Sequence, residues 1–419
     1  MTQVSGLSEG SSASGKVRLA YLVSHPIQYQ APLLRRIAQE PDIDLTVLFG
    51  SDFSLRGYKD EGFGVEVEWD IPLLEGYRSE FLPKLRDTGK VSPTSPVSRG
   101  IYNRLRTPNG APAFDALWVH GYASLNALQA ILAANALGIP VLLRAESWLA
   151  DRSRSPLKLA IKSFIFNDLR HFIAATLPIG TANARYWRHY FGHEMPQFLM
   201  PYAVDNLFFA RRAEDAAASE QQLRLELGLE PGHPVILFAS KLQQRKHCDH
   251  LIEAYYSLLR DHDTSGYKPY LVIVGSGEER ANLEARCLDL GLANVRFAGF
   301  QNQSALPRYF QLADVFVLPS RHEPWGLIVN EAMAAGCPVI VSSDVGSGPD
   351  LVTDGVEGYI YPVGNVAALT TALSRVLNSP EAASTMGEAT RRRIAAWSFE
   401  EDIQGLRQAL AYTTRKLRA

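Results

Sequence analysis

The chain has 419 residues, of which 46% are hydrophobic and 21% charged, and its formal net charge is −2. This length predicts two or three domains, and the composition is ordinary for a soluble globular protein. The nearly balanced charge argues against a chain that binds nucleic acid through its overall charge. The three dispersed cysteines, Cys248, Cys287 and Cys337, favour a reducing compartment and argue against disulfides and a metal cluster.

The first segment, residues 1–15, is rich in Ser and Gly and lacks the basic start and apolar core of a signal peptide. We expect it to be a disordered leader. The most apolar stretch, residues 127–143, is interrupted by Gln129, Asn135 and a Gly-Ile-Pro. This pattern predicts a helix, a turn and a strand rather than a membrane span.

Apolar runs alternate with helical segments from residue 16 onward, which is typical of β/α units that build a parallel sheet. We assign residues 16–210 to a first, N-terminal domain. Residues 51–114 interrupt the pattern, are aromatic and rich in Gly and Pro, and are expected to be an insertion that lines the site. The predicted strands of this domain are residues 16–24, 43–50, 116–121, 139–146 and 175–181.

The pattern restarts at residue 234, after a segment, residues 211–233, that we expect to be a linker with an Ala/Glu-rich helix. Residues 234–398 form the second predicted domain, and residues 399–419 a final helix that packs back across both domains. Two alternating runs of about 200 residues each predict an α/β protein with two doubly wound parallel sheets that face each other. The predicted strands of the second domain are residues 234–240, 269–277, 295–300, 313–320 and 337–343.

Two glutamates stand eight positions apart in RHEPWGLIVNEAMAAGCPVI, a segment that begins at Arg321. Glu323 lies in a loop after a buried strand, and Glu331 lies on the helix that follows, at a position we expect to be exposed. Ligands of parallel sheets bind at the carboxyl ends of the strands, and a helix N-terminus there suits phosphate. Carboxylates beside a phosphate site can accept from hydroxyls, which points to a nucleotide sugar. On spacing alone, two solvated surface glutamates are an equal alternative.

The second half of the sequence resembles the retaining GT-B-fold glycosyltransferases of family 4, which carry a Glu-x7-Glu signature. The segments that carry the resemblance are FASKLQQRKHCDHLIEAY, LVIVGSGEER, VRFAGFQNQSALPRYFQLADVFVLPS, EPWGLIVNEAMAAGCPVIVS and GSGPDLVTDGVEGYIYPVGN. It covers nearly all of residues 234–400 and is looser over residues 180–209. The resemblance implies a GT-B fold of two Rossmann-like domains, with the nucleotide sugar bound mainly by the C-terminal one and no further cofactor.

The resemblance also assigns roles to residues around the two glutamates. It implies that Glu323 holds hydroxyls of the transferred sugar and that Glu331 accepts from the ribose. Lys241 and Lys246 would balance the charge of the leaving diphosphate without a metal ion. The chain departs from the family pattern at Lys241, where arginine is usual, and at His247, where glycine is usual. The remaining implied contacts to the sugar and the phosphates are Gly275 and the backbone around Trp325, Gly326, Leu327 and Ile328.

Polar residues also follow the strands of the first domain. The family often has a histidine at the place of His120, near the transferred sugar; a structural histidine is the alternative. His25, Gln28 and Tyr29 follow the first strand and are candidates for acceptor binding, although a turn made rigid by proline explains them equally well. Arg144 ends another strand, where it either contacts a ligand or forms an ion pair with Glu146.

Two further segments have alternative interpretations. Asp261-His262-Asp263 has the Asp-x-Asp pattern of a metal site, but it precedes a strand and is therefore expected to be a surface turn at the opposite edge of the sheet. We predict no metal site. Residues 155–172 carry apolar residues at helical spacing flanked by Lys158, Lys162 and Arg170. This helix either packs on the sheet or meets anionic lipid or a polyprenyl diphosphate acceptor.

We therefore expect a cytoplasmic, metal-independent, retaining hexosyltransferase. It would move a sugar from a nucleotide-diphosphate sugar to a hydroxyl of a glycan or lipid-linked acceptor, at the inner face of the cytoplasmic membrane. Building a bacterial surface glycan, such as lipopolysaccharide, is the expected role. A sugar-nucleotide epimerase on the same fold and a non-catalytic sugar-nucleotide binding subunit are the two alternatives.

Overall fold

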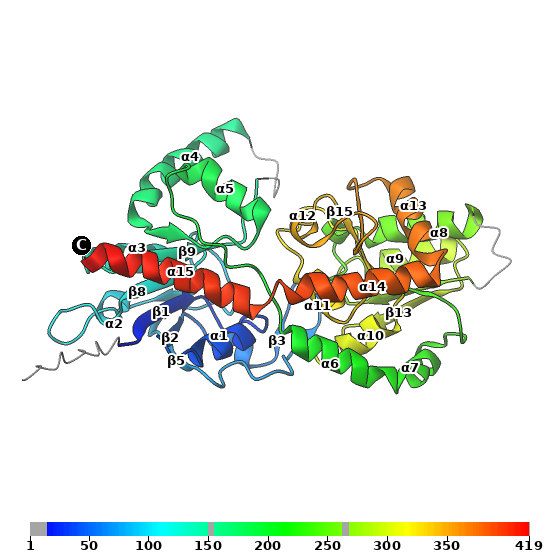
Figure 1. The fold of residues 1–419 in the computed structure, drawn as a ribbon, viewed down its shortest axis with the longest axis horizontal. Coiled ribbons are helices and arrows are strands. Elements are labelled where there is room, and N and C mark those ends of the chain that lie inside the picture. The colour runs from blue at the N-terminus through cyan, green and yellow to red at the C-terminus, as the bar shows by residue number, and fades with distance from the viewer. Residues whose placement is uncertain (1–14, 150–154, 262–267, 419) are drawn as a thin grey trace, which may run out of the picture.

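The structure is a computed structural model that describes residues 15–149, 155–261 and 268–418. It consists of two halves that lie side by side, each built around a six-stranded parallel sheet (Figure 1). The described ranges contain no helix that is both long and apolar enough to span a membrane. The predicted leader, except Gly15, and the residues His262 and Asp263 lie outside these ranges.

The first sheet has the strand order β10-β9-β8-β1-β2-β5. Its inner strands are mostly apolar and buried, because helices cover both faces of a parallel sheet, whereas the edge strand at Arg78–Phe81 is polar and partly exposed. The strand expected at residues 175–181 is only two residues long in the structure. The strands are β1 (Val17–Val23), β2 (Ile43–Phe49), β5 (Arg78–Phe81), β8 (Ala116–His120), β9 (Val141–Arg144) and β10 (Ala175–Thr176); the helices around them include α1 (Ala31–Ala38), α3 (Leu125–Ala136), α4 (Pro156–Leu169) and α5 (Thr181–Phe191).

The second sheet has the order β13-β12-β11-β14-β15-β16, so the direction of winding reverses between β11 and β14. In doubly wound sheets such a reversal leaves a crevice at the carboxyl ends of the two central strands. The strands are β11 (Val235–Ala239), β12 (Tyr270–Val274), β13 (Val295–Gly299), β14 (Val315–Leu318), β15 (Val339–Ser342) and β16 (Gly358–Tyr361); the helices include α8 (Cys248–Asp261), α9 (Arg280–Asp289), α10 (Leu306–Leu312), α11 (Leu327–Ala334), α12 (Gly348–Leu351), α13 (Val366–Leu377) and α14 (Pro380–Ala395).

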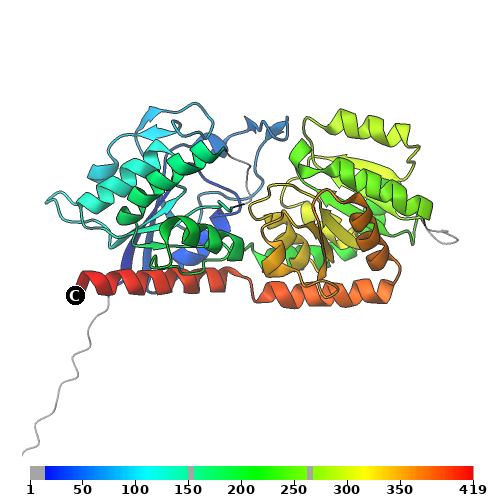
Figure 2. The same ribbon diagram turned by 90° about the horizontal axis from the view of Figure 1, so that it is seen from above.

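The chain passes between the two halves near residues 200–205 and returns near residues 396–398 (Figure 1). Residues 211–233, expected to be a linker, are mostly helical, within α6 (Asn206–Ala217) and α7 (Glu220–Leu227). Ala213 and Leu223 from these helices belong to the core of the second half. The last helix, α15 (Phe399–Arg418), returns to the first half, where Ile403 and Leu406 join the core of the first sheet. Figure 2 shows α14 and α15 almost in line along one side of the molecule.

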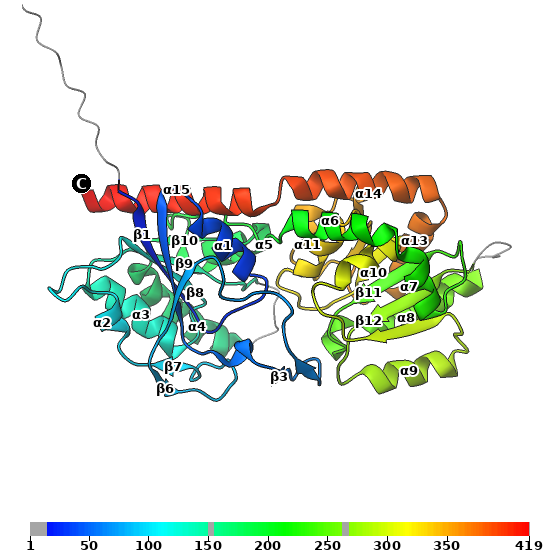
Figure 3. The same cartoon turned by 90° about the horizontal axis from the view of Figure 1, so that it is seen from below.

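The predicted insertion contains two small antiparallel pairs of strands, apart from β5. One pair is a hairpin of β3 (Tyr58–Lys59) and β4 (Glu66–Val67), with Tyr58 opposite Val67. Figure 3 shows this hairpin extending from the first half toward the second. The other pair is β6 (Lys84–Arg86) with β7 (Val97–Ser98), and short helical turns lie at Phe53–Leu55 and Ile101–Arg104.

Candidate functional site

A cavity of about 470 Å³ lies between the two halves, at the carboxyl edge of the second sheet. It is located where the order of that sheet reverses, so the loops after β11 and β14 both line it. The predicted site residues that line it are Lys241, Lys246, Glu323, Gly326, Leu327, Ile328 and Glu331 from the second half, and His25, Gln28 and Tyr29 from the first. The structure therefore brings ten of the predicted site residues together in one place.

The cations of this cavity are paired with carboxylates in the structure. Lys246 donates to Glu323 Oε2, and Arg245 Nη1 lies 3.4 Å from the same oxygen. Lys246 is only 7% exposed, and its burial lowers the pKa of the ammonium group, although Glu323 acts in the opposite direction. Lys241 Nζ donates to both carboxylate oxygens of Asp60, at 2.7 and 2.9 Å. Two lysines and one arginine thus converge on one end of the cavity, which suits a diphosphate.

Glu331 faces the same cavity from the second turn of α11 and is buried, at 8% exposure. The expectation of an exposed helical position was wrong, because the neighbouring half and the loops around α11 cover this face. Its Oε2 has no hydrogen-bond partner among the described residues, and burial raises the pKa of the carboxyl to about 8. A buried acceptor without a partner is costly, and a hydroxyl of a ligand would satisfy it.

The N-terminus of α11 is formed by a glycine in the left-handed region. Gly326 has φ 89°, which a residue with a side chain rarely adopts, and it lets the chain turn sharply into the helix. Leu327 and Ile328 then open the helix at the wall of the cavity, where backbone N–H groups lack intrahelical partners. This end of α11 is therefore suited to bind the oxygens of a phosphate group.

Two of the predicted contacts lie beside the cavity and not in its lining. The side chain of Trp325 is buried, stacks on Trp397 and donates from Nε1 to Asn330 Oδ1 at 2.9 Å. Gly275 has φ 137°, and a Cβ added there would lie 1.9 Å from Ser240 O. The glycine permits the β12 loop to pack directly beneath the loop that carries Lys241.

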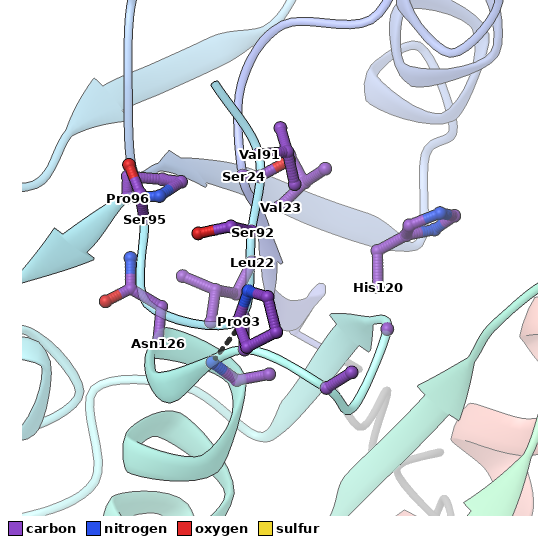
Figure 4. A pocket seen from close by; sticks show the side chains of 14 residues that line it. Leu22, Val23, Ser24, Val91, Ser92, Pro93, Ser95, Pro96, His120 and Asn126 are labelled. Carbon is purple, nitrogen blue, oxygen red and sulfur yellow. Dashed lines mark hydrogen bonds between the residues drawn. The ribbon is translucent and has the colours of Figure 1, made fainter. Parts of the chain in front are cut away.

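His120 ends β8 at the carboxyl edge of the first sheet, where the order of that sheet also reverses. Its Nε2 lies 3.7 Å from Glu146 Oε1, and Gln30 Nε2 lies 3.4 Å from its ring. It borders a separate cavity of about 340 Å³; Figure 4 shows it at the edge of that cavity, apart from the side chains of residues 91–96. The loop after β1 borders both cavities, since Ser24 lines one and His25 the other.

Glu146 is a partly exposed carboxylate that accepts several hydrogen bonds on the first half. Tyr29 donates to its Oε1 at 2.9 Å, and Tyr202 donates to the same oxygen. Burial opposes ionisation of this carboxyl, but His120 and the two tyrosines together lower its pKa to about 2. Tyr29 is therefore held by a charged partner while it lines the main cavity. Burial together with the nearby His120 lowers the pKa of His25 to about 4, so its ring is neutral at physiological pH.

Arg144 does not contact either cavity. It is 2% exposed and donates to Met200 O at 2.8 Å, and its Nη2 lies 3.4 Å from Asp402 Oδ2 of α15. Of the two interpretations of Arg144, the ion pair is the one observed, but its partner is Asp402 and not Glu146. The geometry does not support the predicted acceptor contact through Arg144, because the side chain is buried against Met200 and Asp402 and lines neither cavity.

Several residues of the cavity were not singled out in the sequence. The hairpin contributes Tyr58, Asp60, Phe63 and Trp69, which agrees with the expectation that the insertion lines the site. Nothing in the local sequence marks these four, because they reach the cavity only through the fold of the whole first half. The other residues of the wall on the second half are Ala239, Ser240, Arg245, Phe300, Gln301, Gln303 and Leu306.

One group of residues in the described part of the chain has the composition of a metal site. Ligand atoms of His247, Asp249 and His250 lie within 4.8 Å of one another. The two imidazole rings are stacked at 4.2 Å with 17° between their planes. Lone pairs in parallel ring planes do not converge on one ion, so this arrangement is unsuited to a metal without rotation of a ring. The prediction of a metal-independent reaction stays a prediction.

Comparison with known proteins supplies the context for this geometry. Residues 219–393 match the family described as "Glycosyl transferases group 1", which is less than half of the chain. An uncharacterized glycosyltransferase of Methanocaldococcus jannaschii is 38% identical over 157 residues, which are 37% of this chain and 38% of that one. A D-inositol 3-phosphate glycosyltransferase of Streptomyces griseus is 34% identical over 209 residues, 48% of this chain and 43% of its own length. The matched segments thus span less than half of these curated relatives.

Solved structures confirm the predicted GT-B fold over almost the whole chain. Sucrose-phosphate synthase from Thermosynechococcus elongatus superposes with a TM-score of 0.68 at 19% identity and covers 96% of this chain and 100% of its own. HepE of Anabaena, solved in complex with UDP, superposes with a TM-score of 0.70 at 18% identity and covers 94% of this chain and 99% of its own. The two-sheet architecture is therefore that of GT-B glycosyltransferases, and the matched family segment contains every predicted site residue of the second half.

Proposed function

We propose that this chain is a retaining glycosyltransferase that moves a sugar from a nucleotide-diphosphate sugar to an acceptor hydroxyl. The observation that carries the proposal is the convergence of Lys241, Lys246, Glu323 and Glu331 on one cavity at the carboxyl edge of the second sheet. The family match over residues 219–393 supports it independently. The solved complex of HepE with UDP shows that a protein of this fold binds a nucleoside diphosphate.

The diphosphate, the ribose and the transferred sugar of such a donor each have a complementary group in the cavity. The diphosphate would lie between the two lysines and the N-terminus of α11, where positive charge and backbone N–H groups meet. Glu331 would accept from ribose hydroxyls, which would satisfy its orphaned oxygen. Glu323, on the loop after β14, would accept from hydroxyls of the transferred sugar. Gln28 and Tyr29 line the cavity from the other half, and His120 borders the neighbouring cavity; all three are proposed to meet the sugar and the acceptor.

The reaction would proceed by attack on the same face of the sugar from which the diphosphate leaves. The bond from the anomeric carbon to the diphosphate oxygen breaks, and a bond to the acceptor oxygen forms. The proton of the acceptor hydroxyl passes to an oxygen of the departing diphosphate. Glu323 is paired with Lys246, so we assign it to holding hydroxyls and not to nucleophilic attack. Lys241 and Lys246 stabilise the charge that develops on the leaving group, so we propose no metal ion.

The two alternatives to sugar transfer are a sugar-nucleotide epimerase and a non-catalytic binding subunit. Both an epimerase and a binding subunit would use the same donor cavity. A transferase needs in addition a second substrate surface beside the sugar, and the cavity next to His120 offers one. We therefore favour transfer, and acceptor-independent turnover of the nucleotide sugar would distinguish an epimerase.

We further propose that the acceptor is lipid-linked and is met at an anionic membrane surface. The observation behind this proposal is the outer face of α4, which the structure leaves uncovered. Leu157, Ile161, Phe164 and Ile165 are 70%, 52%, 71% and 55% exposed, while Phe166 is the buried side chain of this helix. Lys158 stands on the same helix, and Arg170 follows it. Apolar side chains with flanking cations are typical of helices that lie on anionic lipid.

The first test of the proposed function is a thermal-shift screen of nucleotide sugars. A ligand that binds only the folded protein raises its melting temperature, so the donor identifies itself by the largest shift. The product formed with that donor and a glycan or lipid-linked acceptor is then examined by NMR. Retention predicts the same anomeric configuration in donor and product; an inverted product would contradict the retaining assignment. Absence of any shift with every nucleotide sugar would contradict the donor site itself.

A further inference from the structure

The hairpin of β3 and β4 brings a carboxylate to the place proposed for the donor's diphosphate. Asp60 lies 181 residues before Lys241 in sequence, yet both of its carboxylate oxygens accept from the lysine ammonium. The pair is partly covered, with Asp60 at 13% and Lys241 at 33% side-chain exposure. Both residues line the same cavity. The carboxylate of Asp60 therefore pairs with one of the two lysines that are proposed to bind the donor's diphosphate.

The hairpin is built to present this carboxylate. Asp60 Oδ1 accepts from the backbone N–H groups of Gly62 and Phe63, at 2.8 and 2.9 Å, which fixes the turn around it. Gly62 has no side chain, and a Cβ there would lie 2.6 Å from Lys241 Cδ. Phe63 places its ring 4.7 Å from Lys241 Nζ. The turn therefore encloses the lysine head with a carboxylate on one side and an aromatic ring on another.

Other contacts hold the hairpin to the second half independently of Lys241. The rings of Phe63 and Phe300 lie 4.8 Å apart at 73°. Asn302 Nδ2 donates to Glu68 O at 2.6 Å, and Ser304 donates to Asp70. The hairpin can thus stay docked when Lys241 turns away from Asp60. An exchange of partners at Lys241 requires the movement of one flexible side chain and not the opening of the whole cleft.

We propose that Asp60 is a built-in competitor of the donor's diphosphate. In the donor-free protein Asp60 pairs with Lys241 and holds its ammonium group under the hairpin. When the donor binds, its diphosphate replaces Asp60 as the partner of Lys241. Burial alone would raise the pKa of Asp60, but hydrogen bonds from Lys241 and from the turn lower it. Asp60 therefore stays charged near neutral pH and must be displaced as an anion. This competition lowers the affinity of the protein for the donor. It also speeds the dissociation of the nucleoside diphosphate after transfer, because Asp60 can pair with Lys241 again. The inference rests on the donor site proposed above.

The test uses the full chain with Asp60→Asn. Asparagine keeps an oxygen for the N–H groups of Gly62 and Phe63 but loses the charge, so the turn survives. Calorimetric titration with inorganic pyrophosphate and with UDP, ADP and GDP should show about three- to tenfold tighter binding to the variant than to the wild type, as expected for a partly exposed ion pair. The matched control is Asp70→Asn in the segment just after the hairpin, because this carboxylate contacts Ser304 and not Lys241; it should not tighten binding.

A second pair of variants separates competition at Lys241 from a general change in charge. In a Lys241→Met background, Asp60→Asn should leave the affinity for pyrophosphate unchanged, because no lysine remains to be contested. Equal or weaker binding to Asp60→Asn alone would overturn the inference, as would equal tightening in the Lys241→Met background. If the wild type binds UDP, ADP or GDP but the Asp60→Asn variants do not behave as expected, the donor site is retained and the role of Asp60 as a competitor is rejected. If neither protein binds any diphosphate, the donor site and the inference both fall.

Discussion

The indole of Trp325 stacks on the indole of Trp397, with ring centroids 5.6 Å apart and 15° between the planes. Trp325 belongs to the loop that precedes α11, and Trp397 to the segment through which the chain returns to the first half. Trp397 Nε1 also donates to Tyr202 O at 2.9 Å, and Asn330 of α11 donates to the same carbonyl at 3.0 Å. The loop before α11 and the helix itself therefore contact both segments that connect the halves. Through these contacts, the position of one half relative to the other is coupled to the wall of the cavity.

Trp397→Ala is expected to weaken nucleoside diphosphate binding, although Trp397 does not line the cavity. Loss of the stack frees the loop that carries Glu323 and Gly326, and truncation of a largely covered indole costs about 2–4 kcal/mol of stability. Trp397→Phe keeps an aromatic ring, so its dissociation constant and melting temperature should lie between those of the wild type and Trp397→Ala. The measurements are the dissociation constant and the melting temperature of the three proteins. A lowered melting temperature with an unchanged dissociation constant at 20 °C would show that the stack stabilises the fold without shaping the site.

Glu331→Gln is expected to stabilise the ligand-free protein increasingly as pH rises from 5 to 8. Burial raises the pKa of this carboxyl to about 8, so the folded chain keeps a proton that the unfolded chain has already lost. The protonated carboxyl contributes its full stability below the unfolded pKa, and this contribution is lost as pH rises through the folded pKa. The loss is at most about 1.4 kcal/mol per pH unit. Glutamine does not titrate, so the variant does not show this loss of stability with rising pH.

Thermal unfolding of the wild type and Glu331→Gln at pH 5, 6.5 and 8 measures this difference. The variant should gain melting temperature relative to the wild type at each step. It should bind nucleoside diphosphates more weakly at pH 8, where the wild-type carboxyl is partly ionised and a carboxylate accepts from ribose hydroxyls more strongly than an amide does. Glu357→Gln is a suitable control, since Glu357 is also buried but lies away from the cavity. A difference between wild type and Glu331→Gln that does not change with pH would contradict the account of this carboxyl.

The α4 surface is expected to bind vesicles that contain anionic lipid. Leu157→Ser with Phe164→Ser should abolish flotation with such vesicles, because these two side chains are the most exposed apolar groups of the helix. The matched control is Leu225→Ser with Leu288→Ser, which removes leucines that are 69% and 82% exposed on the second half. Lys158→Glu should weaken flotation at low salt and less so at high salt, as expected for a screened charge. Equal flotation of the two double variants would contradict a membrane role for α4.

Activity is expected to persist in a chelator of divalent cations. Lys241 and Lys246 supply the positive charge beside the diphosphate, and the arrangement of His247, Asp249 and His250 does not converge on an ion. The measurement is the rate of nucleoside diphosphate release before and after dialysis against EDTA. Loss of the rate, with recovery on addition of Mg²⁺ or Mn²⁺, would overturn this part of the mechanism.

The sequence predicted the parts of this site that depend on local pattern. Lys246, Glu323 and Glu331 follow predicted strands closely, and the carboxyl ends of parallel strands share one edge, so their convergence could be foreseen. The burial of Glu331 could not be foreseen, because it depends on how the other half covers α11. The same holds for Asp60 against Lys241 and for Arg144 against Asp402, pairs that are 181 and 258 residues apart. The amphipathic pattern of α4 left two interpretations open, and only the packed structure shows that its apolar side chains are uncovered.

The donor site itself is tested most directly by titration of Lys246→Met with UDP, ADP and GDP, beside the wild type. Lys268→Met is the control, because this exposed lysine stands just before β12, at the opposite edge of the same sheet. We expect the wild type and Lys268→Met to bind at least one of these diphosphates equally well, and Lys246→Met to bind it at least about tenfold more weakly. Equal affinities for all three proteins, or no binding by the wild type, would contradict a diphosphate site between β11 and β14.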